Sequence, residues 1–364
     1  MSTTAAPEIP VPTPTIATSP AAARHRTTIH PFTALDGVPL TLVHVTRGDG
    51  RPPTRGPVML VHGSGVRAEL FRPPIGRTFV DALLDEGWDV WLLNWRASID
   101  LPPLSWTLDD AAAYDHPAAV QEVCRLAGVD RIRAFVHCQG STSFTIAAVS
   151  GLVPQVETVV SNAVSLHPVI PAWSRFKISA VAPVVARFVS HLSPAWGDRP
   201  VGWVGHTVRG LVKATHHECD NTVCRMVSFT YGAGFPALWS HKNLDDATHE
   251  WVRGEFGDVP LSFFAQMRRS VRAGHLVPAG TRPGLPASYV AEAPKTDARF
   301  VFVAGADNRC FLPLSQQRTY AWFSEHRPGK DALHMLPGYG HLDVLVGKNA
   351  ARDTYPLLLA ELAA

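Results

Sequence analysis

The chain has 364 residues, of which 46% are apolar and 18% are charged, and its formal net charge is +2. This composition provides enough apolar side chains for a large buried core and excludes a chain that is disordered throughout. Because the net charge is small and no basic run stands out, nothing in the sequence indicates nucleic-acid binding.

The cysteine content and the lengths of the apolar runs indicate the cellular compartment in which we expect the protein. The five cysteines form an odd and sparse set, which is not typical of a disulfide framework. The N-terminus lacks the charged start and apolar core of a signal peptide, and no apolar run reaches the roughly 18 to 20 residues that span a bilayer. We therefore expect a soluble, cytoplasmic protein with free thiols and no membrane span.

Along the chain, the first 24 residues are rich in Pro, Ala, Thr and Ser and carry no apolar periodicity, which predicts a flexible tail over 1–24. Asp36-Gly37 then lies between two apolar stretches, as the turn of a β-hairpin would. From there to residue 167, short apolar runs alternate with segments of helical periodicity. They predict strands at 40–45, 58–61, 88–93 and 132–136, and helices at 79–84, 108–126 and 141–149.

The alternation returns near the C-terminus, where the pattern predicts strands at 299–303 and 332–336 and helices at 313–323 and 353–362. Such spacing predicts a mostly parallel central sheet with helices on both faces, built from residues 25–167 and 296–364. The interval 168–295 is mainly helical in pattern and rich in aromatic residues, which indicates an inserted cap. We expect most of these aromatics to form the cap's own core and a few to line an apolar substrate pocket.

A cysteine occupies the turn between a predicted strand and a predicted helix, in the sequence FVHCQGS at 135–141. This is the context of a nucleophile elbow, usually written G-x-S-x-G, with Cys138 in the nucleophile position. Gly140 provides the small residue expected two positions later, whereas Val136 departs from the small residue expected two positions earlier. A thiol here benefits from the helix N-terminus that follows. We therefore predict Cys138 as a nucleophile, the alternative being a small buried apolar residue.

Two further polar segments follow predicted strands, VAGADN at 303–308 and GYGHLD at 338–343. The order nucleophile, acid, histidine predicts a triad of Cys138, Asp307 and His341. His341 would hold the thiolate as an ion pair and later activate the acceptor, and Asp307 would fix the imidazole tautomer. Asp343 is a weaker alternative acid because it lies so near His341 in sequence. The alternatives are a turn-capping aspartate and a structural histidine.

The oxyanion hole should consist of two backbone N–H groups. One belongs to Gln139, directly after the nucleophile. The other belongs to the HGSGV loop at 62–66, to Ser64 or Gly65.

Two other patterns suggest ligand sites that we do not expect. His216, His217, Cys219 and Cys224 resemble metal ligands, but their spacing fits no common zinc pattern, so we expect no metal. The glycines at 63 and 65 lack the third glycine and the following acid of a dinucleotide fingerprint, so we expect no nucleotide cofactor there.

Several segments together resemble a branch of the α/β-hydrolases, the hydrolase-like region fused to some bacterial cholesterol-oxidase-like flavoproteins. They are VHG at 61–63, WDVWLLNWR at 88–96, HCQGS at 137–141, GYGHLD at 338–343 and CDNTVCR at 219–225. The resemblance covers residues 30–360 and implies the α/β-hydrolase fold. Because the chain has no flavin-binding half, we expect no redox role and no cofactor. More distantly, a Cys-His-Asp triad on this fold is similar to that of dienelactone hydrolase.

These features predict acyl transfer through a thioester on Cys138, from an ester, lactone or thioester with an apolar body. The acceptor is water in a hydrolase. In an acyltransferase or transesterase it is an alcohol, amine or thiol, and the partner is then a second substrate or a carrier-bound thioester. A non-catalytic binding protein or a lyase on the same fold is a further alternative.

Overall fold

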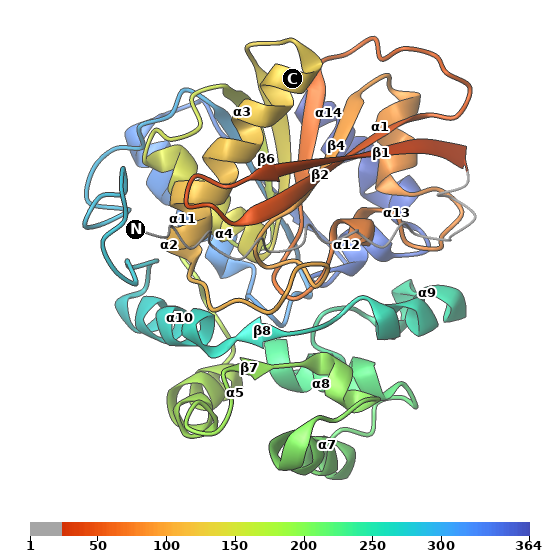
Figure 1. Ribbon diagram of the computed structural model, residues 1–364, viewed down its shortest axis with the longest axis vertical. Helices are drawn as coiled ribbons and strands as arrows, with labels where there is room; N and C mark the ends of the chain where they lie inside the picture. The colour runs from red at the N-terminus through yellow and green to blue at the C-terminus, as the bar shows by residue number, and fades with distance from the viewer. Residues whose placement is uncertain (1–23) are drawn as a thin grey trace, which may run out of the picture.

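The computed structural model describes residues 24–364, so the tail predicted at 1–24 lies outside the described residues except for Arg24. An eight-stranded sheet forms the centre of the molecule (Figure 1), with β1 antiparallel to β2, β2 antiparallel to β4, and the remaining pairs parallel. The strands, in their order across the sheet, are β1 (His25–Thr33), β2 (Pro39–Arg47), β4 (Asp89–Asn94), β3 (Pro57–Val61), β5 (Ile132–His137), β6 (Val156–Asn162), β9 (Arg299–Gly305) and β10 (Ala332–Leu336).

The central strands are buried along their whole length, which explains why they appear in the sequence as continuous apolar runs. Every residue of β3 and of β4 is buried, and so are six of the seven residues of β9. A parallel strand covered by helices on both faces needs apolar side chains on both faces. The predicted mostly parallel sheet is therefore confirmed.

Helices pack on both faces of this sheet, with α3 and α1 on opposite sides of the strands in Figure 1. The predicted helix at 108–126 is continuous, but it contains a five-residue π-helical segment, η3, just before Pro117. Proline has no N–H group and cannot continue the α-helical hydrogen bonding at that point. The helices around the sheet are η2 (Ala68–Phe71), α1 (Phe79–Asp85), α2 (Leu108–Asp110), η3 (Ala111–Asp115), α3 (His116–Ala127), α4 (Gln139–Val149), α11 (Leu314–His326), α12 (Asp343–Val346), α13 (Ala350–Asp353) and α14 (Tyr355–Ala363).

The long connection between β6 and β9 forms a second layer, seen in green and teal below the sheet in Figure 1. Residues 274–298, after its last helix, return along the core, where Leu276 N–H donates to Leu166 O and Lys295 N–H to Val149 O. No helix within residues 24–364 is both long enough and apolar enough to cross a bilayer. The elements of the connection are α5 (Ala172–Phe176), η4 (Lys177–Val181), α6 (Ala182–Val185), β7 (His191–Leu192), η5 (Pro194–Gly197), α7 (Gly202–Thr215), α8 (Thr222–Tyr231), η6 (His241–Asn243), α9 (Asp246–Trp251), η7 (Val252–Gly254), β8 (Val259–Pro260) and α10 (Leu261–Ala273).

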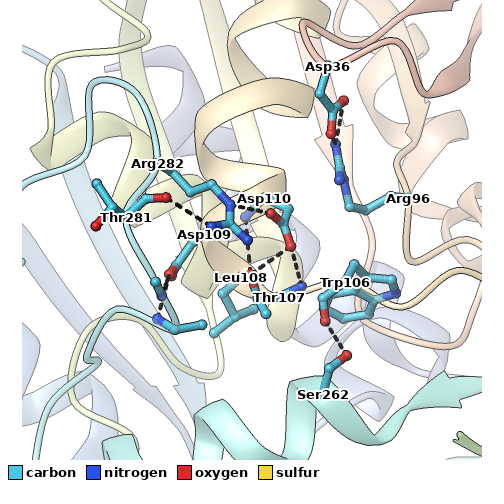
Figure 2. A network of polar contacts seen from close by, with 12 residues as sticks. Asp36, Arg96, Trp106, Thr107, Leu108, Asp109, Asp110, Ser262, Thr281 and Arg282 are labelled. Carbon is cyan, nitrogen blue, oxygen red and sulfur yellow. Dashed lines mark hydrogen bonds and ion pairs between the residues drawn. The ribbon is translucent and has the colours of Figure 1, made fainter.

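A buried carboxylate at the start of α2 joins this connection to the core. Asp109, which is fully buried, accepts hydrogen bonds from Gln266 Nε2 at 2.5 Å, Tyr289 Oη at 2.7 Å and Ala279 N–H at 2.5 Å. Figure 2 shows this region, where Arg282 also forms a 2.6 Å ion pair with Asp110. Because a buried charge is stable only when it is well hydrogen-bonded, Asp109 holds α10 and the 279–289 segment against α2.

We predict that Asp109→Asn destabilises the protein. The change replaces one carboxylate oxygen by an NH2 group, so that some of the groups that donate to Asp109 lose their acceptor. The expected loss is about 2 kcal/mol or more of unfolding free energy, measured from urea denaturation midpoints. The control is the same change at the exposed Asp130, which should leave the midpoint unchanged. Equal midpoints for the two variants would show that the Asp109 hydrogen bonds are not needed.

Candidate active site

Cys138 lies between β5 and α4 with an unusual backbone conformation. Its φ is 56° and its ψ is −122°, and only one other non-glycine residue among 24–364, Ala163, has a positive φ. A side chain in this region carries backbone strain, which persists only where the surroundings enforce it. Here Cys138 N–H donates to Asn162 O, and the Cys138 carbonyl accepts from the N–H groups of Ser141 and Thr142. The predicted sharp strand-to-helix turn is therefore present.

The residues two positions on either side of Cys138 show how tightly this turn packs. A Cβ atom on Gly140 would lie 2.3 Å from the carbonyl oxygen of His62, so only glycine fits there. Val136, which departs from the expected small residue, is fully buried and pairs in register with Val61 of β3. The turn thus accepts a larger side chain before the cysteine but not after it.

The Cys138 sulfur faces two backbone donors. The N–H groups of Gln139 and Ser64 both donate toward it and lower its pKa, but burial has the larger effect and raises the pKa to about 12. Gly65, the other candidate for the oxyanion hole, donates its N–H to Ala97 O at 3.1 Å. Of the candidate N–H groups, those of Ser64 and Gln139 therefore face the sulfur, whereas that of Gly65 is bonded elsewhere.

His341 lies in the loop after β10, where its backbone N–H donates to Leu238 O at 3.1 Å. Side-chain nitrogen atoms of His341 and His137 and the sulfur of Cys138 all lie within 4.8 Å of one another. Burial lowers the pKa of His341 to about 3. Burial also raises the thiol pKa, so burial favours the neutral forms of both groups over the ion pair expected from the sequence.

The structure brings Asn308, not Asp307, to the imidazole. Asn308 Nδ2 lies 3.2 Å from His341 Nδ1. The Asp307 side chain is exposed and makes no hydrogen bond or ion pair with any residue from 24 to 364, although its backbone N–H donates to Tyr339 O. This backbone bond aligns the two loops, but the side chain of Asp307 makes no hydrogen bond with the histidine that the sequence assigned to it.

The orientation of the Asn308 amide determines where a neutral His341 carries its proton. Asn308 Oδ1 accepts the backbone N–H groups of Cys310 at 3.0 Å and Phe311 at 3.1 Å. The amide NH2 group therefore faces Nδ1 and donates to it, which places the imidazole proton on Nε2. Nε2 is buried and has no hydrogen-bond partner among the described residues.

Asp343, the weaker alternative acid, has another role. Its carboxylate is fully buried and accepts from Gly340 N–H at 2.7 Å, Asn243 Nδ2 at 2.6 Å and Ser240 N–H at 3.1 Å. Asp343 thus joins the His341 loop to the 240–243 segment.

His137, which was not among the predicted site residues, lies directly against His341. The two ring centroids are 4.9 Å apart, and His137 Nδ1 lies 3.0 Å from Asn162 Nδ2. Burial lowers the pKa of His137 and keeps the ring neutral. Its position directly before Cys138 in the elbow motif was the one signal in the sequence that could have identified it.

An apolar pocket opens beside the sulfur, with an empty volume of about 510 Å³, part of it open to solvent. Its one lysine, Lys177, donates to Gly232 O at 2.6 Å, and burial lowers the pKa of this amine to about 8. Three of the aromatic residues of the predicted cap are in the lining, as the sequence led us to expect of a few of them. The lining comprises Cys138, Gln139, Ile170, Ser174, Lys177, Ile178, Thr230, Tyr231, Phe263, Phe264, Met267, Cys310 and Phe311.

Solved structures share this architecture, whereas no protein-family model and no curated protein matches the chain. A putative lipase from Sulfolobus solfataricus is similar with a TM-score of 0.58 and 13% identity, covering 97% of this chain and 98% of that one. A monoacylglycerol lipase from Paleococcus ferrophilus has a TM-score of 0.54 and 14% identity, covering 93% and 99%. The esterase Pf2001 from Pyrococcus furiosus has a TM-score of 0.51 and 12% identity, covering 97% and 98%. The chain has the α/β-hydrolase fold.

We predict that Asn308→Asp accelerates the alkylation of Cys138 by iodoacetamide at pH 7. One carboxylate oxygen can keep the two backbone hydrogen bonds while the other accepts from Nδ1–H, which leaves Nε2 free to take the thiol proton. We expect about a tenfold gain or more, followed by site-resolved mass spectrometry. Asp307→Asn is the matched control and should leave the rate unchanged. If Asp307→Asn slows alkylation and Asn308→Asp has no effect, Asp307 is the orienting acid.

The wild-type thiol should also show an unusual pH profile. Only the thiolate is alkylated, so the rate rises about tenfold per pH unit until the pKa is reached. With a pKa raised to about 12, Cys138 should still gain reactivity between about pH 8 and pH 10, where an ordinary thiol levels off. The measurement is the alkylation rate of Cys138 at each pH. A plateau below about pH 8 would indicate a preformed thiolate–imidazolium pair.

Proposed function

We propose that the chain is a cysteine-dependent hydrolase of apolar esters, lactones or thioesters, with Cys138 carrying the acyl group. The observation that supports this most directly is the strained Cys138 turn, which directs the sulfur toward the N–H groups of Ser64 and Gln139. A structural cysteine has no need of a positive φ or of two convergent donors. The fold shared with esterases and lipases is consistent with the same chemistry.

In the proposed reaction, the Cys138 sulfur attacks the acyl carbonyl carbon. The carbonyl electron pair moves to oxygen, and the resulting oxyanion accepts hydrogen bonds from Ser64 and Gln139. The tetrahedral intermediate collapses to a thioester and expels the alcohol or thiol, which leaves with a proton from the imidazole. Water then attacks the thioester, with His341 accepting its proton, and releases the acid and the free thiol.

This sequence of steps requires His341 to accept the thiol proton at Nε2, whereas the resting tautomer already carries a proton there. The imidazole proton must therefore move to Nδ1 before attack. Asn308 would then turn its amide oxygen toward Nδ1–H, in the position that asparagine occupies in Cys-His-Asn triads. We assign Asn308, and not Asp307, as the residue that orients His341.

The pocket favours an apolar acyl group. Phe263, Phe264 and Met267, all from α10, form one wall, and Ile178 faces the same space. A buried acyl chain gains about 0.8 kcal/mol for each CH2 group removed from water. The apolar, partly closed pocket also limits the access of water to the thioester, so transfer to an alcohol, amine or thiol acceptor, free or bound to a carrier, is the alternative outcome.

We predict that a panel of activated esters from acetyl to long-chain acyl leaves a mass adduct on Cys138, with longer apolar groups reacting fastest. Intact-protein mass spectrometry reports the acyl size, and peptide mapping reports the residue. Cys138→Ala should form no adduct, and Cys138→Ser less than about a tenth of the wild-type amount, because the site is arranged for a thiol.

Cys310, which lines the same pocket, provides the matched control. Cys310→Ala should keep the adduct, because its sulfur donates to Tyr231 O and faces no pair of backbone donors. An adduct that persists in Cys138→Ala and disappears in Cys310→Ala would overturn the proposal. Added alcohols, amines or thiols that shorten the lifetime of the adduct and appear in the product would identify an acyltransferase.

A further inference from the structure

The inserted layer holds a second cluster of reactive side chains, far from Cys138 in sequence. Cys219, Cys224, His241 and His249 each direct one ligand-type atom to a common point, and these four atoms all lie within 4.8 Å of one another. All five cysteines of the chain are free thiols. The cluster joins the segment before α8, the first turn of α8, η6 and α9.

This grouping differs from the one that the sequence suggested. His216 packs against the rings of Phe229 and Phe235, and the exposed His217 lies 3.0 Å from Ala214 O. The two cysteines meet instead with histidines further along the chain. Seven residues separate His241 from His249, more than the about three to five typical of zinc-finger histidines, which hid the pattern.

The distances fit tetrahedral coordination. Zinc lies about 2.3 Å from cysteine sulfur and about 2.0 to 2.1 Å from histidine nitrogen, which separates neighbouring ligand atoms by roughly 3.3 to 3.8 Å. Cys224 Sγ lies 3.4 Å from His241 Nε2. The ring centroids of His241 and His249 are 4.8 Å apart and the ring planes are inclined at 74°. Two imidazole rings in this arrangement can each direct one nitrogen atom to the same metal ion. His249 Nε2 is buried and has no hydrogen-bond partner among the described residues.

The chemistry of the ligands selects the metal. Two thiolates and two neutral imidazoles form a soft, nitrogen-containing set that suits Zn²⁺ and disfavours Mg²⁺ or Ca²⁺, which prefer oxygen. Two thiolates also balance the charge of a divalent cation, so the bound site is neutral at a half-buried position. Four protein ligands leave no open position for a substrate, as in structural zinc sites.

We propose that Cys219, Cys224, His241 and His249 form a structural zinc site. The site fixes the path of the chain on either side of it. Asn221, between the two cysteines, caps α8 by accepting Cys224 N–H at 3.0 Å and donates to His249 O at 2.5 Å. Leu238, three residues before His241, accepts the backbone N–H groups of His341 and Leu342. A metal at this point therefore holds the segment that positions the active-site histidine loop.

The test measures metal in the full-length protein, purified under reducing conditions with zinc in the growth medium and dialysed against metal-free buffer. We expect about one zinc per chain by elemental mass spectrometry. Cobalt exchanged into the protein should give the visible absorption of a tetrahedral Co²⁺ site with thiolate charge-transfer bands. A chelator should lower the melting temperature, because metal binding is coupled to folding.

Two pairs of variants separate the site from general effects. Cys224→Ser and His249→Ala should each reduce bound zinc at least tenfold, and the cobalt spectrum of His249→Ala should change even where one metal remains. Cys124→Ser, a half-buried thiol on α3, and His217→Ala, an exposed neighbour, should keep full metal content and the same spectrum. These readouts do not depend on catalysis, so their outcome is separate from that of the Cys138 proposal.

The proposal fails if the reduced wild-type protein binds less than about a tenth of an equivalent of zinc and cobalt gives only an octahedral spectrum. It also fails if peptide mapping of the protein as isolated finds a Cys219–Cys224 disulfide with no metal. Loss of metal in Cys124→Ser or His217→Ala to the same extent as in the ligand variants would equally overturn it.

Discussion

The positive φ of Cys138 is the constraint around which the site is arranged. A backbone reversal between β5 and α4 directs the sulfur back toward the β3 loop, so that one donor from this loop, Ser64, and one from the start of α4, Gln139, can reach it. The reversal is possible because Gly140 leaves room for the His62 carbonyl, which a Cβ would approach to 2.3 Å. The hydrogen bonds that Cys138 makes with Asn162, Ser141 and Thr142 offset the strain of its own conformation.

Burial then determines the chemistry that this geometry supports. Burial raises the pKa of the Cys138 thiol and lowers the pKa values of His341 and His137, so it favours the neutral form of all three groups. In the proposed reaction, the developing oxyanion of a substrate is the charge that the N–H groups of Ser64 and Gln139 would stabilise. A buried thiol with a raised pKa is little ionised at neutral pH, so it reacts slowly with oxidants and alkylating agents.

The sequence predicted the sheet and the strand-to-helix turn at Cys138 because each depends on local pattern. Apolar runs indicate buried strands. The turn that carries the cysteine is recognised from the strand before it and the helix after it, and so it does not depend on how the long insert folds. The sequence pattern could not decide between Asp307 and Asn308, because the two residues are adjacent on one loop. The backbone hydrogen bond from Asp307 N–H to Tyr339 O aligns this loop with the His341 loop, and the side chain of Asn308 is the one that lies beside His341. His241 and His249 were missed because the fold of the insert, and not their spacing, brings them to the two cysteines.

The hydrogen bonds of the buried Asp109 tie one wall of the apolar pocket beside Cys138 to the core of the molecule. Gln266, which donates to Asp109 and accepts from Leu108 N–H, belongs to α10, the helix that also carries Phe263, Phe264 and Met267. On the opposite side of the pocket, the Lys177 amine donates instead to the backbone carbonyl groups of Phe229 and Gly232, which belong to the inserted layer. A shift of that side would therefore leave the hydrogen bonds between α10 and Asp109 intact. In the proposed reaction, the acyl chain would lie against the α10 wall, and the α5–η4 side would be the one that moves to admit it.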